Sequence, residues 1–167
     1  MTRLASILAA SFLAATAVVS GAEAGNRTIV EQHGWGNASG TSQTGERNRL
    51  WQTQEGRGNG AQTQQQGLRN YSDTYQRGSR NRAITDQYGV DNQSVTGQDG
   101  VDHSSNTIQT GRGNIAGSAQ FGRGNASLTD QAGNNNTAAT IQVGDGQEAQ
   151  TVQTGEGNTS VVIQGRR

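Results

Sequence analysis

Few side chains in this sequence have the types and spacings that suit a reactive centre. The two histidines, His33 and His103, stand alone in turn positions, without a second ligand at metal-site spacing. The segment from Gly56 to Gly60 is rich in glycine, as phosphate-binding loops are, but no apolar strand precedes it and no helix follows it. The Ser and Asp positions follow an internal repeat, which gives no support to a Ser, His and Asp constellation. We therefore expect no catalytic residue, no metal site, no cofactor and no enzyme activity.

The side-chain amides of Gln and Asn are spaced for a different chemistry, which is hydrogen bonding in ladders. Gln recurs thirteen times at an unbroken spacing of eleven residues, and Asn follows five residues later in ten units, with His103 and Gln147 as exceptions. A buried unpaired amide costs about 1–3 kcal/mol, but a continuous ladder satisfies its interior members. The predicted ladder residues are Gln32, Gln43, Gln54, Gln65, Gln76, Gln87, Gln98, Gln109, Gln120, Gln131, Gln142, Gln153 and Gln164, with Asn37, Asn48, Asn59, Asn70, Asn81, Asn92, Asn114, Asn125, Asn136 and Asn158.

Three further columns complete the eleven-residue repeat. The seventh residue after each Gln is Ala or Ser except at Leu50, and the ninth is Thr or Ser except at Gln52 and Val162. The second residue after each of the first twelve Gln is Gly, and we interpret these as turn glycines because a tight reversal needs positive φ. They are Gly34, Gly45, Gly56, Gly67, Gly78, Gly89, Gly100, Gly111, Gly122, Gly133, Gly144 and Gly155.

The columns predict the elements that position these residues. An eleven-residue repeat also suits a right-handed coiled coil, but an obligatory Gly would cost such a helix about 1 kcal/mol each time. Asn, Ala/Ser, Thr and Gln alternate with a period of two, which is typical of one face of a strand. Each unit is therefore a strand of about six residues and a turn of about five. Two units make a coil of 22 residues, so we expect an all-β, amyloid-like two-sheet solenoid of about 13 strands, from near Arg27 to near Gln164.

Composition agrees with a fold that lacks an apolar core. The 167 residues include no Cys, no Pro and 25 Gly, only 29% are hydrophobic, and thirteen basic residues balance thirteen acidic ones. This neutrality offers no basic footprint for nucleic acid. Arg3, the apolar run from Leu4 to Val19 and the Ala22-Glu23-Ala24 sequence are typical of a signal peptide. We expect residues 1–24 to be removed on secretion and residues 25–167 to form the solenoid.

The repeat resembles that of the curlin family. The pattern N-x-A-x-x-x-Q-x-G-x-x-N runs from Asn81 to Asn92, recurs from Asn125, and covers essentially all of residues 25–167. The resemblance implies a secreted subunit of curli, the extracellular amyloid fibres of biofilm matrix, at the surface of a Gram-negative bacterium, with roles in cell adhesion. The implied partners are further copies of this chain, a second curlin subunit and a curli-type secretion apparatus, and no nucleic acid or small-molecule substrate. Curlins often have an aliphatic residue where this chain has Thr.

Two alternatives stay open from the sequence. Within the curlin family, the nearly equal half-repeats and Arg166-Arg167 favour a minor curlin that nucleates fibres, whereas the unbroken turn motifs favour a major subunit. Outside the family, a monomeric solenoid could bind ice or glycans. Such a binder needs regular outward columns, and the eighth position of successive units varies from Gly40 through Trp51 to Asp73.

Two groups of residues are expected to control assembly. Single charges lie in outward columns of β-prone strands at Asp73, Asp86 and Asp130. We expect these three residues to be gatekeepers, which slow premature pairing of strands. The last predicted strand contains Val161, Val162 and Ile163 in a row, without charge, Pro or Gly. We expect this strand to make the strongest contact between subunits, because burial of apolar surface contributes about 25 cal/mol per Å².

Overall fold

The computed structural model describes residues 25–165, which form thirteen strands and no helix. The predicted signal peptide at 1–24 lies outside the described residues, as do Arg166 and Arg167. The strands are β1 (Arg27–Trp35), β2 (Ala38–Glu46), β3 (Arg49–Arg57), β4 (Gly60–Leu68), β5 (Tyr71–Ser79), β6 (Arg82–Val90), β7 (Gln93–Val101), β8 (Ser104–Arg112), β9 (Ile115–Arg123), β10 (Ala126–Asn134), β11 (Thr137–Asp145), β12 (Glu148–Glu156) and β13 (Thr159–Gly165). Within residues 25–165, no helix is available that could cross a membrane.

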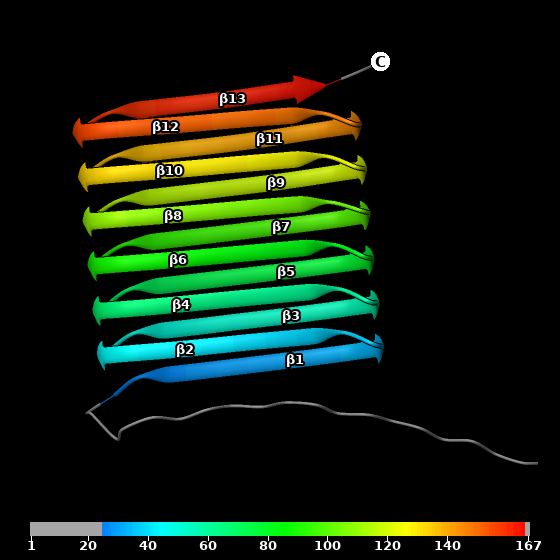
Figure 1. Ribbon diagram of the computed structural model, residues 1–167, viewed down its shortest axis with the longest axis horizontal. Coiled ribbons are helices and arrows are strands. Elements are labelled where there is room, and N and C mark those ends of the chain that lie inside the picture. The colour runs from blue at the N-terminus through cyan, green and yellow to red at the C-terminus, as the bar shows by residue number, and fades with distance from the viewer. Residues whose placement is uncertain (1–24, 166–167) are drawn as a thin grey trace, which may run out of the picture.

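The strands alternate between two parallel sheets, which confirms the predicted two-sheet β-solenoid. Sheet A contains the seven odd-numbered strands in chain order, and sheet B contains the six even-numbered strands. Figure 1 shows the coils as a regular stack from β1 at one end to β13 at the other. Neighbouring strands pair in register at an offset of 22 residues, as Gln54 does with Gln76. Each interior column therefore stacks on itself, at about 4.8 Å per coil.

The strands are longer than the six residues expected from the sequence. Twelve of the thirteen contain nine residues, and each of the predicted turn glycines is the eighth residue of its strand. Gly78, for example, has φ of +107° and yet stays paired in register with Gly56 and Gly100. Because every coil bends at the same position, the bend does not interrupt pairing between coils. The glycine columns are thus bends inside the sheets.

The true turns contain only two residues. The first of them has positive φ in each turn, as Arg69 does with φ of 55°, and the second belongs to the Asn column. The turn backbone also bonds between coils, because the Arg69 N–H donates to the Glu46 carbonyl at 3.0 Å and the Tyr71 N–H donates to the Asn92 carbonyl at 2.8 Å. This pairing offsets the cost of about 1 kcal/mol for a left-handed residue that is not Gly.

The space between the sheets is mostly polar. Its buried apolar side chains are those of Leu50, Ala61, Ala83, Ala116, Ala138 and Ala149. The other buried positions within residues 25–165 hold Gln, Asn, Thr, Ser and His103. Hydrogen bonds between coils therefore stabilise this fold in place of the burial of apolar surface, which stabilises an ordinary domain.

Candidate functional site

The Gln residues form two continuous ladders, one inside each sheet. In every link the Nε2 atom of one Gln donates to the Oε1 atom of the Gln 22 residues later, at 2.6–2.9 Å. The sheet A ladder runs from Gln32 to Gln164 and the sheet B ladder from Gln43 to Gln153. All links have the same direction, so each ladder is polar along the stack.

From Gln43 to Gln164, each ladder amide also donates to a backbone carbonyl of the other sheet. Gln98 in β7 donates to the Gln120 side chain at 2.8 Å and to the backbone carbonyl of Arg82 at 3.0 Å. Arg82 is the first residue of β6 in the other sheet, so this bond crosses the interior. Gln98 also accepts from Gln76 at 2.8 Å. A fully bonded amide avoids the penalty of about 1–3 kcal/mol for an unpaired buried group.

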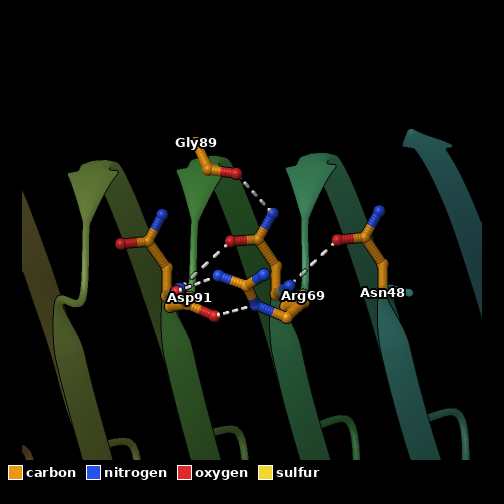
Figure 2. Close-up of polar contacts among 6 residues, drawn as sticks. Asn48, Arg69, Gly89 and Asp91 are labelled. Atoms are coloured by element: carbon orange, nitrogen blue, oxygen red, sulfur yellow. Dashed lines mark hydrogen bonds and ion pairs between the residues drawn. The ribbon is translucent and has the colours of Figure 1, made fainter. Parts of the chain in front are cut away.

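The Asn column differs from the predicted amide ladder, because most of its bonds go to the backbone. Asn48 Oδ1 accepts the backbone N–H of Asn70 at 2.9 Å, and Asn70 Nδ2 donates to the carbonyl of Gly89 at 3.0 Å (Figure 2). Direct amide links between Asn side chains occur only toward the C-terminal end, among Asn92, Asn114, Asn136 and Asn158, at 3.0–3.2 Å. Asn has the shorter side chain, and the backbone of the turn and of the bend lies within its reach.

The two exceptions in the Asn column reproduce part of its bonding. His103 is 1% exposed, its Nδ1 atom accepts the backbone N–H of Asn125 at 3.2 Å, and its Nε2 atom lies 3.3 Å from the carbonyl of Asp99. Because Nδ1 accepts, the proton of the neutral ring is on Nε2. Burial lowers the pKa of His103, against the opposing effects of the Asp99 and Gly122 carbonyls and the Asp99 and Asp102 carboxylates. Gln147 donates to the carbonyl of Val143 at 2.9 Å.

The glycine column provides the carbonyls that these amides need, and it leaves no room for a side chain. A Cβ atom on Gly78 would lie 2.0 Å from the carbonyl oxygen of Gly100 in the next coil. Gly97, on the outer face of β7, has nothing within 4 Å of the same atom. Repetition of Gly is therefore required by contact between coils as well as by positive φ.

Ion pairs connect neighbouring coils at the turns. Arg69 and Asp91 are the left-handed residues of two turns on the same edge, and their side chains form two bonds of 2.7 Å (Figure 2). Arg80 and Asp102 do the same on the opposite edge, at 2.6 and 2.8 Å. Arg69 lowers the pKa of Asp91, and Arg80 lowers the pKa of Asp102. All four side chains are exposed, so these pairs contribute little to stability.

The remaining candidate residues for chemistry lie apart from one another. His33 is exposed on the outer face of β1, whereas His103 is buried at a turn between β7 and β8. Within residues 25–165, no group of three or more His, Cys, Asp or Glu side chains could hold a metal ion. A hollow of about 470 Å³ lies over β2, β4 and β6, lined mainly by Gly, Ala, Ser, Thr and Gln.

The three proposed gatekeepers lie in outward columns at half-buried positions. Asp73 pairs with Trp51 and Val95 on the two adjacent strands, and Asp130 pairs with Ile108 and Val152. Asp86 also has Ile108 beside it, on β8, and has Gln64 on its other side. Burial raises the pKa of Asp73, which accepts a bond from Tyr71 at 3.3 Å, and burial raises the pKa of Asp86. Asp73 and Asp130 therefore each separate two apolar side chains, whereas Asp86 has an apolar neighbour on one side only.

The described solenoid ends in edge strands at both ends of both sheets. β1 and β2 are the edges at the N-terminal end, and β13 and β12 are the edges at the C-terminal end. In β13, Val161 and Ile163 are 61% and 71% exposed on the outer face, and Val162 points to the interior beside Thr140. The Gln column continues into all four edge strands. The other two columns change at the ends of sheet A: β1 has Thr28 in the Ala/Ser column and Val30 in the Thr column, and β13 has Val162 in the Thr column.

Sequence reasoning missed two features of this arrangement. It did not identify the ion pairs at the turns, although Arg69 and Asp91, like Arg80 and Asp102, are 22 residues apart, which is one coil. It also assigned the Asn residues to an amide ladder, because stacking alone does not say whether a side chain bonds to its equivalent or to nearby backbone.

No protein-family model matches the chain, and no curated protein sequence matches it either.

Proposed function

We propose that this protein is a secreted structural subunit that stacks end to end into curli-type extracellular fibres. The observation that carries the proposal is the continuation of both Gln columns into the four edge strands of the described solenoid, through Gln32 and Gln43 at one end and Gln153 and Gln164 at the other. Because sheet A has one strand more than sheet B, an added copy turned by 180° about the stack axis can place its β1 on β12 and its β2 on β13, and so continue both sheets and both ladders. A soluble repeat protein instead has capping repeats with a polar outer face.

The polarity of the ladders supports head-to-tail stacking. Within residues 25–165, no Gln side chain donates to the Oε1 atom of Gln32 or Gln43, although Thr28 donates to Gln43, and the Nε2 atoms of Gln153 and Gln164 donate to no Gln side chain. A C-terminal end therefore offers donors to the acceptors of an N-terminal end. Two like ends would oppose donor with donor or acceptor with acceptor.

The biological setting of the proposal rests on the curlin resemblance together with the solenoid fold. In this setting the fibre belongs to the biofilm matrix of a Gram-negative bacterium and serves cell adhesion. Its partners are other copies of the chain, a second curlin subunit and a curli-type secretion apparatus. We assign the protein a structural role, without catalysis.

Purified residues 25–167, diluted from denaturant, test the proposal. We expect a lag phase, then fibres that bind thioflavin and diffract at about 4.8 Å along the fibre axis, with the lag removed by seeds. Growth extends existing sheets, whereas nucleation has no template. A folded monomer that persists at micromolar concentration and does not respond to seeds would contradict the proposal.

A minor curlin that nucleates fibre growth is the second candidate function, and a mixing experiment separates it from the first. Trace amounts of a nucleator abolish the lag of a second curlin from the same cell. A major subunit shortens only its own lag. The irregular outer columns disfavour a monomeric binder of ice or glycans, because Gly40, Gln62 and Ile84 succeed one another in one outward column of sheet B.

A further inference from the structure

The outer surface of sheet A changes character along the stack. Its last three strands, β9, β11 and β13, present an apolar face, defined by six large side chains that are 38–71% exposed: Ile115, Phe121, Ile141, Val143, Val161 and Ile163. Strand pairing makes this face continuous, because β11 pairs with β9 on one side and with β13 on the other. The outward positions between these six residues hold only Gly, Ala and Thr.

This face lacks the charges that interrupt apolar columns elsewhere. On sheet A, Asp73 on β5 lies between Trp51 and Val95, and Arg77 on the same strand pairs with Asp99 on β7. Between Ile115 and Gly165, no charged residue occupies an outward position of the apolar face, and Arg123 and Asp145 lie at its rim. Such a surface would not bind a charged partner favourably, whereas it would bind a flat, apolar partner favourably.

The sizes of the side chains are complementary to a second copy of the same face. Rotation by 180° about an axis parallel to the strands places β9 of one copy opposite β13 of the other and β11 opposite itself. Each large side chain of the outer strands then meets a smaller residue. The facing pairs, read from the registers of the three strands, are Ile115 with Thr159, Gly117 with Val161, Ala119 with Ile163, and Phe121 with Gly165. Rotation about the stack axis would instead oppose Ile115 with Phe121 and Val161 with Ile163.

The area of the face determines when this contact forms. Three strands of about seven residues cover about 300 Å² per copy, or about 600 Å² for a pair. Stable interfaces bury at least about 1,200 Å² in total, so two isolated subunits would not stay together. If subunits stack as proposed above, the half-turn between copies makes the face recur on each side of the fibre at every second subunit, and many weak contacts act together.

We propose that the apolar face joins two fibres of this protein side by side, each contributing the same face, with the fibres running in opposite directions. This inference rests on the proposed stacking function. The contact is a sheet-on-sheet interface whose partner is another copy of this chain. This contact is not needed within a single fibre, so the pairing of two fibres and the growth of one fibre are separable properties.

Charge substitutions at Ile141 test the inference, because this residue faces its own counterpart. Fibres of I141K and of I141D should grow and bind thioflavin like wild type but lose side-by-side pairing in electron micrographs, because like charges then meet at every contact. Mixing preformed I141K fibres with preformed I141D fibres should restore pairing. The matched control is Val95→Lys, which adds the same charge to an exposed apolar position of sheet A outside the face and should leave pairing intact.

The outcomes separate this inference from the proposed function. Absence of fibres from wild type would defeat both. Wild-type fibres that remain single, or I141K fibres that pair as well as wild type, would overturn only the inference. The inference alone would also be overturned if wild-type fibres stay single and co-sediment with phosphatidylcholine vesicles while I141K fibres do not. The face would then bind lipid. Loss of pairing in V95K as well as in I141K would also overturn the inference, because any added charge would then suffice.

Discussion

Inside the solenoid, most side chains meet the same type of residue in the coils on either side, whereas on the outer surface the neighbours of a side chain change from coil to coil. Gln98 lies between Gln76 and Gln120, but Asp73 lies between Trp51 and Val95. The interior therefore specifies the register of every strand, and the outer surface is free to carry other properties. A substitution should be costly in an interior column and mild at a matched outward position.

The glycine bend should give the largest difference between the two regions. Gly78→Ala places a Cβ atom 2.0 Å from the Gly100 carbonyl at a backbone φ of +107°, and we expect a loss of about 3–5 kcal/mol of stability. Gly97→Ala meets nothing within 4 Å, so its effect should stay within about 0.5 kcal/mol. Guanidinium denaturation midpoints of the two variants measure this difference, and equal midpoints would refute the steric explanation.

The Gln ladder should give the next largest difference. Gln98→Leu preserves approximate volume but leaves a donor on Gln76, an acceptor on Gln120 and the Arg82 carbonyl without their partner, at an expected cost of about 2–4 kcal/mol. The exposed outward residue Gln64 is the control, and Gln64→Leu should change stability by less than about 0.5 kcal/mol. If the two variants denature at the same guanidinium concentration, the ladder does not hold the coils together.

His103 makes the interior sensitive to pH at a single coil. Its pKa is lowered in the folded state, so its contribution to stability is present above the unfolded pKa of about 6.5 and is lost as pH falls through the folded value. Protonation of Nδ1 also removes the acceptor for the Asn125 N–H, which costs about 1–3 kcal/mol.

His103→Asn restores the residue type of the column and should remove most of this acid sensitivity. The measurement compares denaturation midpoints of wild type and variant at neutral pH and at a pH well below 6. His33→Asn, at the exposed position on β1, serves as the outward control and should leave the pH profile unchanged. A wild-type profile that is no steeper than that of H103N would show that the buried ring does not titrate.

The ion pair at the outer edge should give the smallest effect. Asp91→Asn keeps a residue that tolerates positive φ but removes the charge that Arg69 contacts. We expect a small loss of stability that vanishes at about 1 M salt, where screening acts over about 3 Å. Because Arg69 lowers the pKa of Asp91, this contribution is present near neutral pH and disappears in acid as the carboxylate is protonated. A loss as large as that of Gln98→Leu would contradict the ranking of the two regions.

The same contrast explains how much of the structure could be predicted from the sequence. Columns such as Gln32 to Gln164 repeat without a break, so the strands, their two-sheet arrangement and the 22-residue coil could be read directly. The length of the strands could not, because Gly and Asn signal positive φ without saying whether pairing continues through the bend. Nor could the bonds of Asn70, since its amide has both a stacked equivalent and nearby backbone within reach. The apolar face was within reach of the sequence, because the 22-residue coil sets which outward residues become neighbours, as it does for Ile141 and Ile163.

The side-chain hydrogen bonds between neighbouring coils have a consequence for the whole molecule. The inter-coil hydrogen bonds of the Gln and Asn side chains join residues 16, 19 or 22 positions apart. Each coil therefore depends on the coils directly before and after it. The solenoid is therefore one-dimensional in the thermodynamic sense, and its stability is a sum over successive interfaces. It has no centre whose loss would unfold the rest. A cut at the turn formed by Asp91 and Asn92 would remove one link in the chain, and the coils on either side would keep most of their partners.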